Sequence, residues 1–128
     1  MNNIHKTAII EEGAILGDNI TIGAFTIIGK DVKIGDGTII DSHTLIDGKT
    51  TIGKNNHIFS HASIGTIPQD LKFNGEDVEL IIGDNNKIRE YTLFNPGTIG
   101  GGSITRIGSN NLFMGYVHVA HDCIIGNN

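Results

Sequence analysis

Aliphatic residues recur at every sixth position along the first half of the chain. The series runs through eleven positions without a gap, from Ile4 to Ile64. A period of six fits neither the 3.6-residue turn of an α-helix nor the two-residue alternation of a plain strand. It is typical of a parallel β-helix, in which each hexad supplies one short strand and one corner. We therefore predict an all-β chain with a short strand at each of these aliphatic positions.

Smaller residues form a second series, four positions after the aliphatic ones. Among them are Ala8, Thr26, Thr44, Ala62 and Thr92. We expect these side chains to point inward as well. Three hexads would make one coil of a triangular prism, and residues 18 apart would then stack at roughly the 4.8 Å spacing of neighbouring strands. This arrangement predicts about seven coils and a stack of Ile10, Ile28, Ile46, Ile64 and Ile82.

Two interruptions break the six-residue period. Between Ile64 and Ile82 the aliphatic positions are taken by Asp70 and Glu76, and we expect this coil to carry a loop at residues 65–81. Between Phe94 and Ile107 one hexad has seven residues added, which predicts a second loop at residues 95–106. Functional residues are often found on loops that a rigid scaffold holds. These loops and the residues that stack beside them are therefore the candidate site.

Composition and charge exclude several classes of protein. The 128 residues fit one domain, residues 1–128. A formal net charge of −5 without a run of Lys or Arg argues against nucleic acid or an anionic membrane surface as the partner. No segment approaches the roughly 18 apolar residues of a membrane span, and no signal-peptide pattern is present. The lone Cys123 fits a reducing compartment, so we expect a cytoplasmic location.

The sequence HVAHDC, which begins at His118, is the clearest candidate for chemistry. A histidine beside an acid, such as His121 beside Asp122, can act as a general base. The alternative is a pair of solvated corner residues. Neighbours in a regular strand point to opposite faces, so the two can cooperate only if the corner turns one of them back. We expect no metal site, because the spacing of the two histidines is a poor match to hexapeptide proteins that bind metal.

Both loops carry residues that could bind a ligand. In QDLK, the amide of Gln69, the carboxylate of Asp70 and the ammonium of Lys72 suit sugar hydroxyls or a phosphate, although polar residues are also ordinary in a loop. The second loop contains GTIGGGS, whose backbone N–H groups could cradle a phosphate. It lacks the Lys-Ser/Thr pair of a P-loop, so we do not expect a nucleoside triphosphate site. Cys123 falls at an inward position and is expected to be a small core residue.

Over all 128 residues the chain resembles the N-terminal half of the UDP-N-acetylglucosamine acyltransferases that begin lipid A synthesis. The resemblance lies in ASIGTIPQDLKFNGE, GTIGGGSITRIGSNNLFM and HVAHDCIIGN. It implies a left-handed β-helix, a homotrimer with active sites between subunits, and transfer of a 3-hydroxyacyl chain from acyl carrier protein to the glucosamine 3-position of the UDP-sugar. No cofactor is implied apart from the phosphopantetheine that carries the acyl donor.

The resemblance also implies roles for single residues. His121 would be the general base and Asp122 its support, while the sugar nucleotide would be held by Gln69, Asp70, Lys72 and His118. Asn95 stands where better-known members have a histidine, and whether the acceptor carries a 3-hydroxyl or a 3-amino group stays open.

The chain stops at Asn128 in mid-hexad, and we expect the natural protein to continue. The family's C-terminal coils, helices and oxyanion amide would lie beyond that point, so the 128 residues alone should be at most weakly active. The competing interpretations are a non-catalytic β-helical scaffold, a sugar-nucleotide binding module, and the sister N-acyltransferase of the same pathway.

Overall fold

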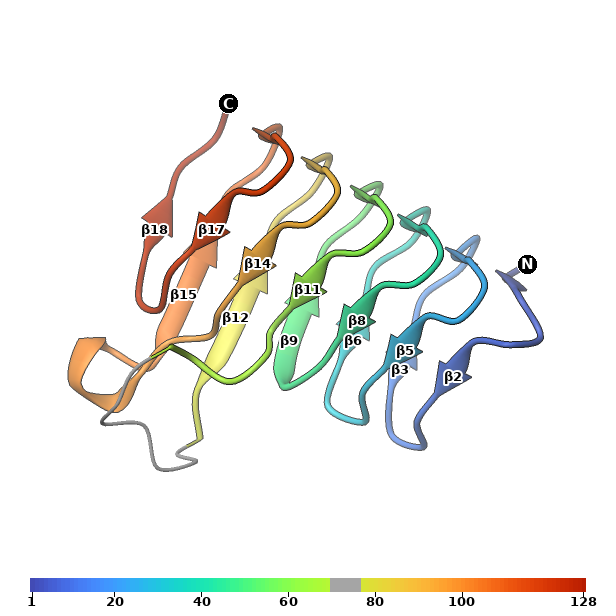
Figure 1. Cartoon of the computed structure of the whole chain (residues 1–128), viewed down its shortest axis with the longest axis horizontal. Helices are drawn as coiled ribbons and strands as arrows, with labels where there is room; N and C mark the ends of the chain where they lie inside the picture. The colour runs from blue at the N-terminus through green and yellow to red at the C-terminus, as the bar shows by residue number, and fades with distance from the viewer. Residues whose placement is uncertain (70–76) are drawn as a thin grey trace.

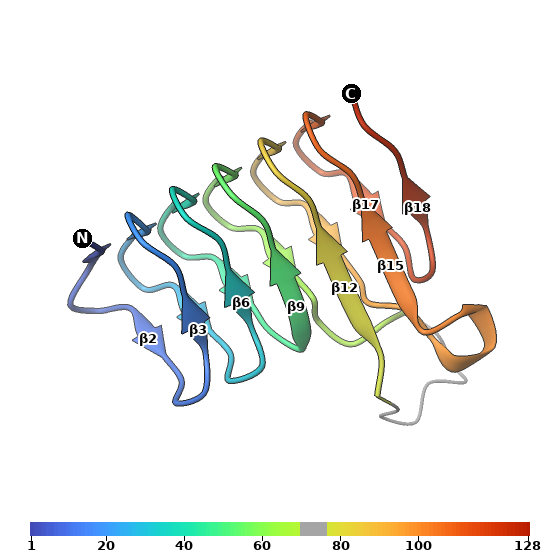
Figure 2. The same ribbon diagram turned by 180° about the vertical axis from the view of Figure 1, so that it is seen from behind.

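A computed structural model describes residues 1–69 and 77–128 and shows a left-handed parallel β-helix (Figure 1). The chain winds around a three-sided prism whose sides are parallel sheets, each of six strands in the described residues. Figure 2 shows the same coils from behind, with the two termini at opposite ends of the prism. No described segment forms a helix that is long and apolar enough to cross a membrane.

The three sheets are built from strands that follow one another in rotation along the chain. Sheet 1 contains β1 (Asn3–Ile4), β4 (Thr21–Ile22), β7 (Ile39–Ile40), β10 (His57–Ile58), β13 (Lys87–Ile88) and β16 (Leu112–Phe113). Sheet 2 contains β2 (Ile9–Ile10), β5 (Ile27–Ile28), β8 (Leu45–Ile46), β11 (Ser63–Ile64), β14 (Leu93–Phe94) and β17 (His118–Val119). Sheet 3 contains β3 (Ile15–Leu16), β6 (Lys33–Ile34), β9 (Lys49–Ile52), β12 (Glu79–Ile82), β15 (Ile104–Ile107) and β18 (Ile124–Ile125).

The interior confirms the two inward series that the sequence predicted. The second residue of most strands is buried, as Ile28 and Ile46 are. Thr26, Thr38, Thr44 and Ala62 of the second series are buried between them, while Ala8 and Cys123 are partly buried against the same core. A buried hydroxyl needs a hydrogen-bond partner, and Thr38 Oγ1 donates to the carbonyl oxygen of Gly53 in the next coil at 3.0 Å. Threonine is therefore tolerated in the interior where a carbonyl oxygen at a corner accepts a hydrogen bond from its hydroxyl.

The expected stack is correct for its first four members and wrong for the fifth. Ile10, Ile28, Ile46 and Ile64 are successive partners in sheet 2, but Ile64 then pairs with Phe94. Ile82 lies on sheet 3 and pairs with Ile52. The first interruption is thus a loop inserted at one corner and not a coil that carries a loop. For this reason the described residues make six coils, one fewer than expected.

The loops are also shorter than expected at their C-terminal ends. Strands β12 and β15 begin at Glu79 and Ile104, so the loops end at residues 78 and 103. Each of these strands is four residues long because it pairs along its whole length with its neighbour. A short 3₁₀-helix, η1 (Ile99–Gly101), lies within the second loop. Both loops leave the prism at the corner between sheets 2 and 3, as Figure 1 shows.

A ladder of neighbouring rings, most of them stacked, runs along the corner between sheets 1 and 2. Its members are Phe25, His43, His61, Tyr91 and Tyr116, and each ring centroid lies 5.2–5.3 Å from the next. All five residues have a positive φ, which is uncommon for residues other than glycine. The regular coil spacing brings the rings into contact and so stabilises this corner.

Candidate active site

The corner after β17 brings His121 and Asp122 together. Asp122 has a φ of 64°, in the left-handed region, and this reverses the direction of its side chain relative to a regular strand. His121 Nδ1 and Asp122 Oδ2 are 2.8 Å apart as a result. The corner therefore turns the side chain of Asp122 back toward His121, as cooperation between these two neighbours requires.

The carboxylate of Asp122 accepts hydrogen bonds from the second loop as well. The backbone N–H of Thr98 donates to Oδ1 at 2.7 Å, and the hydroxyl of Thr98 donates to Oδ2 at 2.6 Å. Burial alone would raise the pKa of Asp122, but the hydrogen bonds from Thr98 and His121 outweigh it and hold this pKa below its ordinary value. The carboxyl group is consequently ionised and fixed in one orientation.

This arrangement determines which nitrogen of His121 carries the proton. An ionised carboxylate only accepts hydrogen bonds, so Nδ1 of His121 must be the donor toward Asp122. In the neutral ring Nε2 then has a free lone pair. The His121 side chain is 35% exposed, so a substrate hydroxyl could reach it. The pair has the geometry of a general base and the group that orients it.

The glycine-rich part of the second loop packs directly against Asp122. A Cβ atom on Gly101 would lie 2.2 Å from the Asp122 carboxyl group, whereas one on Gly100 would meet nothing within 4 Å. Glycine at position 101 is required by this close approach. In the same stretch, which could cradle a phosphate by its sequence, the backbone N–H of Thr98 instead donates to the carboxylate of Asp122.

His118, the other histidine of the motif, is held by Asn95. Asn95 is fully buried, and its Oδ1 lies 2.8 Å from Nε2 of His118. The amide nitrogen of Asn95 donates to the carbonyl oxygens of Thr66 and Ile67 at 3.2 and 3.3 Å. Carbonyl oxygens only accept, which fixes the amide orientation, so His118 must donate from Nε2. Asn95 therefore links His118 to the beginning of the first loop.

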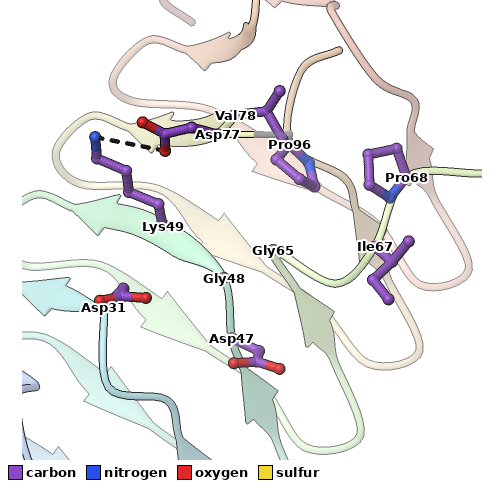
Figure 3. A pocket seen from close by; sticks show the side chains of 10 residues that line it. All are labelled: Asp31, Asp47, Gly48, Lys49, Gly65, Ile67, Pro68, Asp77, Val78 and Pro96. Carbon is purple, nitrogen blue, oxygen red and sulfur yellow. Dashed lines mark ion pairs between the residues drawn. The ribbon is translucent and has the colours of Figure 1, made fainter. Parts of the chain in front are cut away.

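The predicted ligand-binding residues of the first loop are only partly described. Gln69 is exposed at the end of the described segment, while Asp70 and Lys72 lie outside the described residues. A hollow of about 380 Å³ opens beside this loop, lined by Ile67, Pro68 and Pro96 together with residues of earlier coils (Figure 3). Lys49 and Asp77 form an exposed ion pair of 3.9 Å at its rim. The residues that line this hollow do not include His118, His121 or Asp122.

Other candidate groups have simpler surroundings. Cys123 is partly buried and packs against the core, as expected for a small inward residue. His57 lies 3.1 Å from Asp41 on the surface of the prism. Within residues 1–69 and 77–128 no group of three or more His, Cys, Asp or Glu side chains is arranged to hold a metal ion.

Comparisons with known proteins agree with this fold. The family model of bacterial transferase hexapeptide repeats matches residues 13–48. The structure of LpxA from Acinetobacter baumannii is 48% identical, with a TM-score of 0.96 over 97% of this chain and 48% of that one. The UDP-N-acetylglucosamine acyltransferase from Campylobacter jejuni is 45% identical, with a TM-score of 0.94 over 98% of this chain and 49% of that one. The fold is therefore the left-handed β-helix of hexapeptide repeats that these transferases share.

The curated sequences that match the chain point to one family of enzymes. Acyl-[acyl-carrier-protein]--UDP-N-acetylglucosamine O-acyltransferase of Aliarcobacter butzleri is 97% identical over all 128 residues, which cover 49% of its length. Over all 128 residues the chain is similar to the UDP-N-acetylglucosamine O-acyltransferases, and it spans about half the length of the curated relatives that it matches.

Proposed function

We propose that the protein containing this sequence transfers a 3-hydroxyacyl chain from acyl carrier protein to the glucosamine 3-position of UDP-N-acetylglucosamine, the first step of lipid A synthesis. The observation that carries the proposal is the His121–Asp122 pair, which leaves Nε2 of His121 free to accept a proton. The names of the relatives supply the substrates.

The reaction follows from this pair. Nε2 of His121 takes the proton from the 3-hydroxyl as its oxygen attacks the thioester carbonyl. The carboxylate of Asp122 stabilises the imidazolium that forms, because their hydrogen bond becomes charge-assisted. When the tetrahedral intermediate collapses, the C–S bond breaks and the imidazolium returns the proton to the departing thiol. The acyl chain moves directly, without a covalent intermediate on the protein.

The substrate-binding part of the proposal assigns the sugar nucleotide to Gln69, Asp70, Lys72 and His118. Gln69 is exposed, and His118 lies at the same end of sheet 2 as the base. The proposed assembly is a cytoplasmic homotrimer. An outward row of aliphatic residues on sheet 2, including Ile9 and Ile27, supports contact with other subunits, since both side chains are at least 40% exposed.

The test is the substitution His121→Ala in the full-length protein, with acyl transfer measured from an acylated carrier protein. Loss of a general base should lower the turnover by about 10²- to 10⁴-fold. His5→Ala is the matched control, because His5 is an exposed histidine of the first coil and should leave the rate unchanged. Circular dichroism should show the same β-sheet content in both variants. A normal rate in the His121→Ala protein would refute the role of His121 as the base, whereas absence of acyl transfer in the unsubstituted protein as well would favour a scaffold or binding module.

A further inference from the structure

The second loop sends two buried polar side chains toward the two histidines of the HVAHDC motif. Asn95 is fully buried and Thr98 is 7% exposed. Each of them bonds to other parts of the protein in this arrangement. Their contacts indicate what the loop does for the site.

Thr98 acts on His121 through Asp122. It provides two donors to the carboxylate, and the third comes from His121 itself. The backbone N–H of Asp122 donates to Thr105 Oγ1 at 2.8 Å, which fixes the main chain at the same point. Without the Thr98 hydroxyl, the carboxylate could rotate away from Nδ1, and the position of the imidazole ring would become less defined.

Asn95 acts on His118 and on the first loop. Its oxygen fixes the tautomer and the ring orientation of His118, and its nitrogen bonds two successive carbonyl groups of the first loop. The three hydrogen bonds use both donors and one lone pair of the amide. The proposed binding residues on the two sides of the site are thus joined by a single buried side chain.

We propose that the loop at residues 95–103 positions both histidines of the site: Thr98 orients His121 through Asp122, and Asn95 orients His118 while fastening the first loop. The inference rests on the proposed acyl transfer, because it assigns the two residues to the base and to the binding side of that reaction. It predicts separate kinetic effects for the two side chains.

Thr98→Val tests the first half in the full-length protein. Valine keeps the shape and the backbone N–H but removes one hydrogen bond to a charged group, so kcat should fall about 10- to 100-fold while KM stays within about twofold. Thr98→Ser keeps the hydroxyl and should restore most of the rate. An unchanged kcat in Thr98→Val, together with unchanged ring-nitrogen signals of His121, overturns the assignment. Failure of both Thr98→Val and Thr98→Ala to fold would make Thr98 a purely structural residue and would overturn it as well.

Asn95→Asp tests the second half. A carboxylate still accepts from His118 but cannot donate to the carbonyl groups of Thr66 and Ile67, so the first loop should loosen and KM for the UDP-sugar should rise roughly tenfold. The control is Asn56→Asp, which alters another buried amide, bonded to Gly83 O, away from the histidines. It should lower thermal stability and leave KM unchanged. Equal KM values in all three proteins would overturn the role of Asn95, as would failure of Asn95→Asp and Asn95→Ala to fold.

The ring-nitrogen NMR signals of the two histidines separate this inference from the proposed function. In the native protein His121 should be protonated at Nδ1 and His118 at Nε2, and Thr98→Val should disturb only His121. A change in the His121 signal of Thr98→Val, combined with full activity of His121→Ala, would refute the role of His121 as the general base and leave the positioning of His121 by Thr98 supported. Loss of activity in His121→Ala, with neither a kinetic nor a spectral change in Thr98→Val, would support His121 as the base and refute its positioning by Thr98.

Discussion

Among single residues, Asp122 makes the stability of the fold depend on pH. Its pKa is held below the ordinary value, so ionisation stabilises the folded state at every pH above the unfolded pKa of about 3.9. This contribution is lost as the pH falls through the lower, folded pKa. Asp122→Asn removes it, and the free energy of unfolding of the variant should decline less between about pH 5 and the acid limit. Urea titrations at a series of pH values measure the difference, and parallel curves for the two proteins would contradict it.

Thr92 is the exception among the buried threonines. Its hydroxyl has no hydrogen-bond partner in the described part of the chain, whereas that of Thr38 donates to Gly53. Thr92→Val should therefore raise the free energy of unfolding by about 1 kcal/mol, and Thr38→Val should lower it by about 1 kcal/mol. Denaturant unfolding of the two variants beside the parent provides the test. A loss of stability in both would indicate that Thr92 has a partner, such as a water molecule.

At the scale of elements, the second loop contains a matched pair of glycines. A methyl group at Gly101 would collide with the Asp122 carboxyl, whereas Gly100 faces open space. Thr98 and His121 hold that carboxyl, so it can make room for the methyl group only by leaving these hydrogen bonds. Gly101→Ala should therefore reduce the acyl-transfer rate about tenfold or more. Gly100→Ala should have no effect on the rate. Steady-state kinetics of the two full-length variants decide the question, and equal rates would mean that the loop yields without disturbing Asp122.

The strands could be predicted from the sequence more fully than the loop ends. The six-residue period locates each two-residue strand because one side chain must face the core at every pass. The starts of β12 and β15 were missed, although Leu80 and Thr105 are fully buried inward residues. Both lie two positions before an aliphatic residue, as the small series does elsewhere. The small series was counted forward from an aliphatic residue four positions earlier, and for Leu80 and Thr105 that position is taken by Glu76 and Gly101, which hid the relation.

For the molecule as a whole, the sequence predicted a triangular β-helix but not the route of the chain through the first interruption. A gap of 18 residues between Ile64 and Ile82 fits either a full coil or one side of the prism with a long corner loop, and only the pairing of Ile82 with Ile52 distinguishes them. The His121–Asp122 pair could be proposed because the two are neighbours in the chain. The contacts of Asn95 and Thr98 could not, because they depend on how the inserted loop residues fold back.

Because the coils stack regularly, the position of each residue is defined by the face of the prism on which it lies and by the coil, or layer, to which it belongs. An insertion of 18 residues ahead of the loops would add one layer of about 4.8 Å and leave every face unchanged. An insertion of six would instead rotate everything that follows by a third of a turn, so the histidine pair would open onto a different side of the prism. Added hexads in this part of the protein should therefore be tolerated only in whole coils, and the distance of the site from the N-terminal end can change only in steps.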